Sequence, residues 1–281
     1  TSQWYKLQYP ECFVNEQERM LQKTLADFTD REIMPVRDQI DDDVTHEKII
    51  NPLLKKLQVD LGCQKNAIPK DYGGNQLSIV ACALKQEQIG RGDYGISMHS
   101  AVTEWVWVPV LLAYLAPFSP KAKAWAKAVL DEFAPRFVGN ELHAGCFNMS
   151  EEQSACDIEN PLNEGRTIRV RAKLEGNEWV INGNKVWASN AGVADLNCVV
   201  CNMDPRLGKD AFALIYVPEP WPGVSHGKFE VKCGMQADRN TSTYFDNVRV
   251  PKEWGLQGPE AWVIFENTLA APMPLNTAHS I

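Results

Sequence analysis

The spacing of hydrophobic residues changes twice along this chain. Up to about residue 143, apolar residues recur every three or four positions, which is the period of an α-helix. From Cys146 onward apolar and polar residues alternate, as in β-strands, and after Trp254 the helical period returns. We therefore predict a multidomain α+β fold. It comprises an all-α helical domain over residues 1–143, an antiparallel β-barrel or sandwich domain over 144–255, and only the start of a C-terminal helical region over 256–281.

The helical part carries clear start signals. Asn15 and Glu18 have the spacing of a capping box, which precedes an apolar face at helical spacing. Ser119 suits an N-cap, and Pro120 suits the first helical position after it. Pro109 is expected to kink an almost wholly apolar helix. The predicted helical segments are 51–61, 78–90, 96–116 and 119–133, and the Pro- and Gly-containing turn IPKDYGG covers 68–74.

Seven short runs in the second part are typical of β-strands, and Gly, Asn and Pro separate them. Asn182-Gly183 predicts a tight hairpin turn between two of them. The predicted strands are TIRVRAKLEG (167–176), NEWVING (177–183), NKVWAS (184–189), LNCVVCNM (196–203), AFALIYV (211–217), GKFEVKCG (227–234) and STYFDNVRVP (242–251).

The composition limits the function classes. The 281 residues are 44% hydrophobic and carry a net charge of -8, so we expect no nucleic acid and no anionic membrane surface as partner. We expect no membrane span either, because no apolar run is long enough. The first residues show neither a signal-peptide pattern nor an arginine-rich transit pattern.

Eight cysteines are scattered along the chain, and two of them, Cys198 and Cys201, form a CxxC pair. Such a pair can be redox-active or form half of a zinc site. Its run, LNCVVCN, reads as a buried strand, on which a spacing of three points the thiols to opposite faces. We interpret both as core residues, because no second pair completes a zinc site.

The order helices, strands, helix accompanies a set of motifs that resembles the acyl-CoA dehydrogenase flavoprotein family. Together the motifs cover residues 15 to about 265, and the third and fourth are the most specific. They are IPKDYGG, ALKQEQIGRGDYGISMHSAV, WVINGNKVWASNAGVAD and YFDNVRVPKEW, with CFNMSEEQSACD in the place of the family's flavin-binding loop.

The resemblance implies an FAD held between the β domain and the helices. By matched position, Trp187 lies against the isoalloxazine ring, and Ser189 forms a hydrogen bond near flavin N5. Two residues apart on a strand, these side chains share one face. Ser150 stands where the family's threonine touches the N1/O2 side. The resemblance also implies that Phe147 and Met149 line the flavin.

The chain departs from the family in the flavin-binding loop. Glu152, Gln153 and Ala155 replace the family's proline and glycines, which restricts the backbone and adds a carboxylate close to an expected phosphate. Cys156 replaces a serine that lies near the flavin phosphate and the CoA ligand. By resemblance Cys156 is assigned to cofactor and substrate binding, and Thr241 to substrate binding.

A second departure concerns the start of the third domain. The family places an arginine there, where this chain reads LAAPMP near Met273. A subgroup places its catalytic glutamate just before that arginine, where this chain has Pro272. Glu266 is about two helical turns away from that position. No residue matches the catalytic base, so the catalytic residues are unknown.

The resemblance implies FAD-dependent α,β-dehydrogenation of an acyl-CoA thioester, in fatty-acid β-oxidation or related lipid metabolism, with an electron-transfer flavoprotein as acceptor. The base and the remaining FAD contacts come either from a partner chain in a homo- or hetero-oligomer or from the rest of a longer protein. The expected location is the bacterial cytoplasm or the mitochondrial matrix. The alternatives are a non-catalytic structural subunit of a larger complex and a flavin oxidase or monooxygenase on the same fold.

Several other residues have ordinary structural interpretations. We expect His99 and His143 to be packing or surface residues. Trp105 and Trp107 are expected to fill the helical core and not to form an acyl pocket. The run Asp41–Asp43 is interpreted as a solvated helix end.

Overall fold

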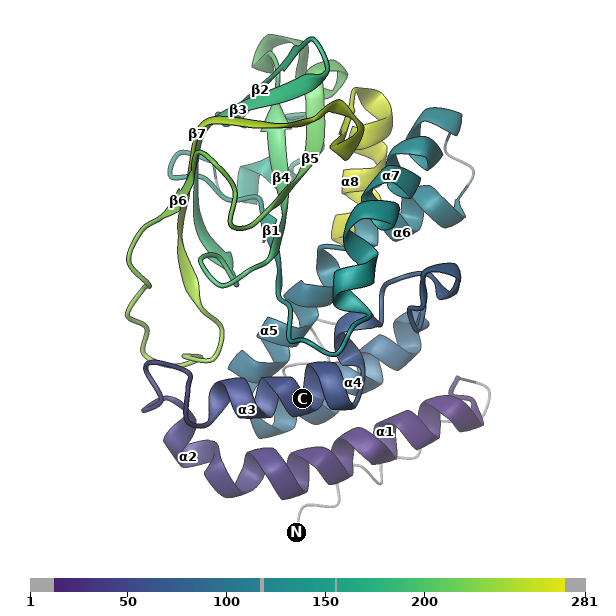
Figure 1. Ribbon diagram of the computed structural model, residues 1–281, viewed down its shortest axis with the longest axis vertical. Helices are drawn as coiled ribbons and strands as arrows, with labels where there is room; N and C mark the ends of the chain where they lie inside the picture. Colours follow the sequence, from purple (N-terminus) through teal and green to yellow (C-terminus); the bar gives the residue numbers. More distant parts are fainter. Residues whose placement is uncertain (1–12, 117–118, 155, 271–281) are drawn as a thin grey trace.

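The computed structural model describes residues 13–116, 119–154 and 156–270 (Figure 1). Helices dominate up to Phe137, strands follow, and one helix closes the described chain. The α-helices are α1 (Glu16–Phe28), α2 (Arg37–Ile40), α3 (Ile50–Lys55), α4 (Ile79–Gly92), α5 (Tyr94–Trp105), α6 (Val108–Leu115), α7 (Pro120–Phe137) and α8 (Pro259–Ala270). This order confirms the predicted fold class.

Short turns of other helix types connect these elements. Two are π-helical, η2 (Thr29–Ile33) and η4 (Lys56–Asp60). The rest are 3₁₀ turns: η3 (Met34–Val36), η5 (Cys63–Lys65), η6 (Lys70–Tyr72), η7 (Cys156–Glu159), η8 (Pro205–Ala211) and η9 (Lys252–Trp254). The turn η6 confirms the expected IPKDYGG turn, and a Cβ on Gly74 would lie 2.0 Å from the Ile68 carbonyl oxygen.

The predicted helix starts are confirmed. The Asn15 side chain accepts from the Glu18 N–H at 2.9 Å, and the Glu18 carboxylate accepts from the Asn15 N–H at 3.0 Å. Ser119 caps α7 by accepting from the Ala122 N–H. Asp43 is a correction, because its carboxylate is buried and caps the start of α3 through the N–H groups of Ile49 and Ile50.

The long apolar helix predicted over 96–116 is broken into α5 and α6 at residues 106–107, and Pro109 lies in the first turn of α6. Among the described residues, the stretch Tyr94–Leu115 is long and apolar enough to cross a membrane by length and composition, which corrects the expectation that no apolar run has this length. Within its most apolar window, 67% of the residues are buried inside the protein, as in a core helix.

The strands form one eight-stranded mixed sheet. They are β1 (Gly145–Asn148), β2 (Arg171–Glu175), β3 (Glu178–Ser189), β4 (Leu196–Asn202), β5 (Phe212–Pro218), β6 (Val224–His226), β7 (Asn240–Pro251) and β8 (Gly255–Gln257). The order is β6-β7-β3-β2-β4-β5-β8, and β1 also pairs with β4. Most pairs are antiparallel as predicted, but β1 and β2 each run parallel to β4.

Two local predictions are wrong. Asn182-Gly183 is not a hairpin turn: β3 runs through it with an irregularity in its pairing with β7, and Gly183 has a φ of 129°. The register shift leaves the extra residue on β7, and glycine at 183 allows a close backbone approach, since a Cβ there would lie 3.1 Å from the Val170 Cα. The run 227–234 forms no strand, although Gly227 and Glu230 donate backbone hydrogen bonds to the β7 residues Ser242 and Asn240.

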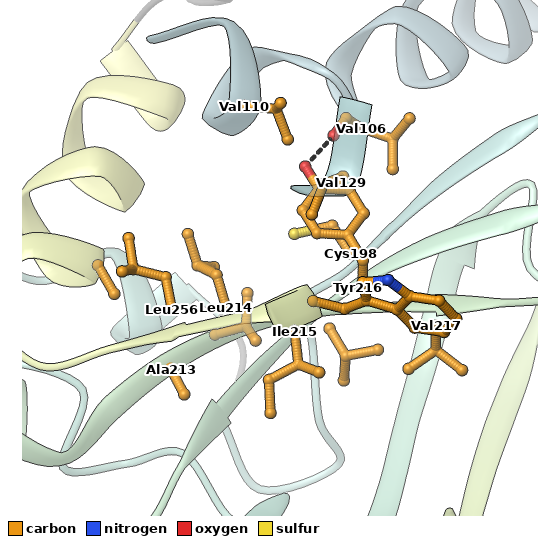
Figure 2. Packing of buried hydrophobic residues seen from close by; sticks show 14 of the residues in the cluster. Val106, Val110, Val129, Cys198, Ala213, Leu214, Ile215, Tyr216, Val217 and Leu256 are labelled. Carbon is orange, nitrogen blue, oxygen red and sulfur yellow. Dashed lines mark hydrogen bonds between the residues drawn. The ribbon is translucent and has the colours of Figure 1, made fainter. Parts of the chain in front are cut away.

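One buried cluster joins the sheet to α6, α7 and α8, and a second lies among α1, α3, α4 and α5. Figure 1 shows α8 between the sheet and the α6–α7 pair. Figure 2 shows Tyr216 of β5 pointing to the α5–α6 break, where its hydroxyl donates to the Val106 carbonyl oxygen. A side chain of the sheet thus satisfies a carbonyl group that lies where the helix is broken.

Candidate functional site

The strand β3 changes its pairing with β7 at Trp187. Lys185 pairs with Thr243 and Ala188 with Thr241, so two residues of β3 face one residue of β7. This is a β-bulge, and Trp187 within it has a φ of 54°. The left-handed conformation costs a non-glycine residue about 1–2 kcal/mol. The strained backbone thus carries an indole that is 58% exposed.

Ser189 lies two residues beyond the indole, and Ala188 between them is buried. The Ser189 hydroxyl donates to Asp238 Oδ2 at 2.9 Å. The side-chain amide of Asn240 donates to the Trp187 carbonyl oxygen at 3.1 Å and lies 3.4 Å from Ser189 Oγ. The first residue of β7 thus holds both ends of the exposed pair in place.

Asp238 did not stand out in the sequence. It is 3% exposed, and burial raises the pKa of its carboxyl to about 6, against the opposing charge of Lys232. Among the described residues, Asp238 Oδ1 has no hydrogen-bond partner. Its contact with Ser189 joins positions 49 residues apart, so no local sequence pattern signals it.

The segment Phe147–Ser150 runs beside β3. The Phe147 ring is buried and stacks on Trp105 at 5.2 Å between centroids, with Phe265 at 6.4 Å. Its side chain therefore belongs to the core between α5 and α8. The Met149 carbonyl oxygen accepts from Lys185 Nζ at 2.8 Å, and the Ser150 carbonyl oxygen accepts from the Val186 N–H at 2.9 Å. This segment is fastened to β3 just before the bulge.

Glu151 anchors the start of the loop over residues 151–156. Its buried carboxylate accepts from Lys185 Nζ at 2.8 Å and from the N–H groups of Arg169 and Val170 at 2.6 and 3.0 Å. Burial lowers the pKa of the fully buried Lys185 ammonium group. Both carboxylate oxygens are thereby satisfied, which is what a buried ion pair requires.

The altered part of the loop is only partly described. Glu152 and Gln153 are exposed and line a pocket of about 180 Å³ together with Arg169 and Asn184. Ala155 and the side chain of Cys156 lie outside the described residues. The cofactor and substrate roles predicted for Cys156 therefore stay predictions.

Thr241 lies beside the bulge but turns away from it. Its side chain is buried, and its hydroxyl donates to the Lys228 carbonyl oxygen at 2.8 Å. In the sheet it pairs with Ala188, next to Ser189. The structure thus brings Trp187, Ser189 and Thr241 together, and the Thr241 hydroxyl is engaged within the protein.

Trp107 fills the core as predicted, fully buried and edge-on to Phe137. The partly exposed Trp105 donates to the Thr268 carbonyl oxygen of α8.

His99 is buried, lines a pocket of about 560 Å³, and has a pKa lowered to about 3 by burial. It is therefore neutral. His143 packs against Phe137, and its Nδ1 lies 3.2 Å from Asp195 Oδ1.

No group of three or more potential metal ligands exists within the described part of the chain. Cys198 and Cys201 are buried free thiols, and burial raises the pKa of both, that of Cys201 to about 12. A thiol that remains protonated is neither a nucleophile nor a metal ligand. The interpretation of this CxxC pair as core residues fits the structure.

Two family models match the chain. The acyl-CoA dehydrogenase N-terminal domain matches residues 15–116, and the middle domain matches residues 146–248, the part that contains the bulge at Trp187. The chain belongs to the acyl-CoA dehydrogenase family. The match to both domains, in this order, confirms the resemblance that the sequence motifs predicted.

Individual relatives agree with this assignment. The chain is 27% identical, over 245 residues, to the mitochondrial short-chain specific acyl-CoA dehydrogenase of Homo sapiens, covering 87% of this chain and 54% of that protein. It is 29% identical to cyclohexane-1-carbonyl-CoA dehydrogenase of Syntrophus aciditrophicus, covering 79% and 52%. The chain thus spans about half the length of the curated relatives it matches.

The fold is also that of a solved family member. Butyryl-CoA dehydrogenase from Megasphaera elsdenii superimposes with a TM-score of 0.80 at 19% sequence identity, covering 98% of this chain and 66% of that one. At this identity the similarity concerns the fold. The helical part, the mixed sheet and α8 together form the shared architecture.

Proposed function

We propose that this chain acts in an FAD-dependent acyl-CoA dehydrogenase, which oxidises the α,β-bond of an acyl-CoA thioester and passes a hydride to flavin N5. The observation that carries the proposal is the β-bulge that exposes Trp187 beside Ser189, within a segment matched by the family's middle domain. A strained backbone that holds out an aromatic face is expected where a flat ligand binds.

The described residues fit a flavin ring. The exposed indole of Trp187 offers it a flat apolar face, and the partly exposed Ser189 offers a hydroxyl two residues away. The partly exposed Ser150 offers a second hydroxyl next to the segment that Lys185 and Val186 fasten to β3. When bound, FAD supplies the hydride acceptor of the reaction.

The protein side chains have separate tasks in this proposal. Trp187 covers one face of the ring and keeps water from it, which strengthens polar interactions at the ring edge. Ser189 presents its oxygen at that edge, held between Asp238 and Asn240. The Glu151–Lys185 pair keeps the loop and the strand in register around the bulge.

The catalytic base is proposed to come from outside the described residues. The base must reach the proton that it removes, and no described residue matches the family position for it. Positions Pro272 and Met273 lie outside the described part. A partner chain or further sequence of the same protein supplies the base and the remaining FAD contacts in this proposal.

The same proposal includes an acyl-CoA substrate, an electron-transfer flavoprotein as acceptor, an oligomeric enzyme and a role in fatty-acid β-oxidation. The bacterial cytoplasm or the mitochondrial matrix is the proposed location. These assignments depend on the family membership and on the site around Trp187, and each needs its own test.

The test is purification of the native protein with any bound partners, followed by absorbance spectroscopy. We expect an oxidised-flavin spectrum that bleaches when an acyl-CoA is added anaerobically. Replacing Trp187 by alanine should abolish flavin retention, whereas replacing the exposed Leu162 by alanine should not.

Three outcomes would contradict the proposal. A colourless native complex that takes up no added FAD would indicate a structural subunit. Bleaching followed by oxygen consumption without an electron-transfer flavoprotein would indicate an oxidase. A bound flavin that no acyl-CoA reduces, in a preparation of the native complex, would exclude dehydrogenation of these thioesters.

A further inference from the structure

Ser189 does not have a free proton to offer a ligand. Its hydroxyl donates to Asp238 Oδ2, and the Asn240 side-chain amide approaches the same oxygen at 3.4 Å. A serine hydroxyl has one proton and two lone pairs. With the proton directed to Asp238 and one lone pair facing Asn240, only a lone pair remains for the surface beside Trp187.

The orientation of the Asn240 amide is itself fixed. Lys232 Nζ donates to Asn240 Oδ1 at 2.5 Å, so the amide nitrogen points the other way, to the Trp187 carbonyl oxygen and Ser189 Oγ. The same ammonium group donates to the backbone carbonyl of Asp238. The donor that faces Ser189 therefore cannot change into an acceptor without breaking the contact with Lys232.

We propose that Asp238 is a positioning residue, which decides whether Ser189 presents a lone pair or a proton to a ligand lying on Trp187. An ionised Asp238 accepts a hydrogen bond from the Ser189 hydroxyl, and Ser189 can then only accept from the ligand. A protonated Asp238 donates to Ser189 Oγ, and the serine hydroxyl is then free to donate a hydrogen bond to the ligand. This inference deepens the proposed function and rests on it for the identity of the ligand.

The surroundings of Asp238 make both states accessible. Its carboxyl is 3% exposed, its Oδ1 has no partner among the described residues, and its pKa is raised to about 6 by burial. It lines a pocket of about 140 Å³ together with Lys232, Gln236, Arg239 and Asn240. Protons can therefore be exchanged with solvent through this pocket.

Charged and titratable groups surround Asp238 on several elements. Lys232 lies in the same loop, and the buried Cys146 of β1 is held protonated by a pKa raised well above its usual value. The Arg239 side chain turns to His46, whose pKa burial lowers to about 4. From α5, Gly95 lies against residues 237–238, and the cap residue Asp93 has a pKa raised by burial. Asp41 accepts from the Gln236 N–H in the Asp238 loop. Of these groups, Asp238 is the one in hydrogen-bond contact with Ser189.

If FAD is the ligand, the two states of Ser189 suit different redox states of the flavin. Oxidised N5 only accepts a hydrogen bond, and reduced N5 carries a hydrogen that it can donate. A Ser189 that offers a lone pair matches the reduced edge, and one that offers its proton matches the oxidised edge. Affinity for oxidised FAD should therefore fall as Asp238 ionises.

The first experiment needs no ligand. Carbon-13 NMR of the side-chain carboxyls, with Asp238 assigned through the Asp238→Asn variant, should show a titration midpoint near pH 6. In Ser189→Ala the midpoint should rise, because the ionised carboxylate loses its donor. A midpoint near the ordinary 3.8, or one that Ser189→Ala leaves unmoved, would overturn the proposal.

The second experiment titrates oxidised FAD into the protein from about pH 5 to about pH 8, across the range where a carboxyl with a raised pKa ionises. We expect affinity to weaken about tenfold, the effect of one hydrogen bond. In Asp238→Asn the amide donates permanently to Ser189, so binding should stay tight and independent of pH. The exposed control Asp246→Asn should behave as wild type.

The two experiments separate the inference from the proposed function. NMR coupling together with a complete lack of FAD binding would contradict the proposed function while supporting the link between Asp238 and Ser189. FAD binding whose pH dependence survives in Asp238→Asn would overturn the inference and leave the proposed function standing.

Discussion

Two buried carboxylates hold β3 on either side of Trp187, and they are satisfied in opposite ways. Glu151 reaches Lys185, two residues before the indole, and Asp238 reaches Ser189, two residues after it. Each is 3% exposed. Glu151 accepts from an ammonium group and from two backbone N–H groups, whereas Asp238 accepts from a neutral hydroxyl and leaves Oδ1 without a partner among the described residues.

The difference separates a structural role from a responsive one. A carboxylate whose oxygens all have donors, one of them charged, fixes its loop. A carboxylate that is buried with too few donors keeps its proton to a higher pH, and this is seen in the raised pKa of Asp238. The bulge at Trp187 therefore has one rigid support and one that responds to pH.

Breaking the rigid support should have the largest effect. Lys185→Met leaves Glu151 buried without its charged partner, and we expect a loss of about 3–5 kcal/mol in the free energy of unfolding. Urea denaturation measures it. The matched control is Lys173→Met, which removes an exposed pair with Glu175 and should change stability little. Equal losses in both variants would show that the buried pair contributes no more to stability than the exposed pair.

Asp238→Asn should have the next largest effect, and with the opposite sign. The folded pKa of Asp238 is raised from 3.8 to about 6, so ionisation lowers stability as pH rises through this range. The variant should therefore match wild type near pH 4 and exceed it by up to about 3 kcal/mol near pH 8. Urea midpoints measured across this range test it, and a parallel pH profile for the variant would contradict it.

The sequence predicts one part of this site and not the other. Trp187 and Ser189 could be found because their signature is contiguous and two residues apart on a strand. Asp238 could not, because its role depends on a contact with Ser189 across 49 positions and on its burial. A carboxylate in the run QADRN looks like any solvated loop residue until the fold encloses it.

The fold shows the same limit. Capping residues such as Asn15 and Ser119 act within one turn of helix, so their pattern predicts the helix starts correctly. Asn182-Gly183 is equally local, but a glycine with positive φ also occurs inside strands, and here β3 continues through it in its pairing with β7. The alternation over 227–234 likewise predicts a strand, yet Val231 is 97% exposed there.

A smaller effect is expected from the positive φ of Trp187, which lies between the two carboxylate contacts. Trp187→Gly removes the cost of a positive φ and should raise the free energy of unfolding by about 0.5–1 kcal/mol, while flavin retention is lost. The neighbouring Ala188→Gly, outside the left-handed region, should instead lower it by a similar amount. Thermal unfolding and flavin absorbance of both variants provide the check. Destabilisation by Trp187→Gly would mean that packing of the indole outweighs the strain.

The smallest effect is expected at Glu152, which follows the satisfied Glu151 and is itself exposed beside Arg169. Glu152→Gln removes a negative charge without removing a buried contact, so stability should not change. If the loop lies near the FAD phosphates, affinity for FAD should rise about twofold, and this gain should disappear at high salt because exposed charges are screened. Glu253→Gln, also exposed, serves as the control. A gain that persists in high salt would point to a direct contact in place of a long-range charge effect.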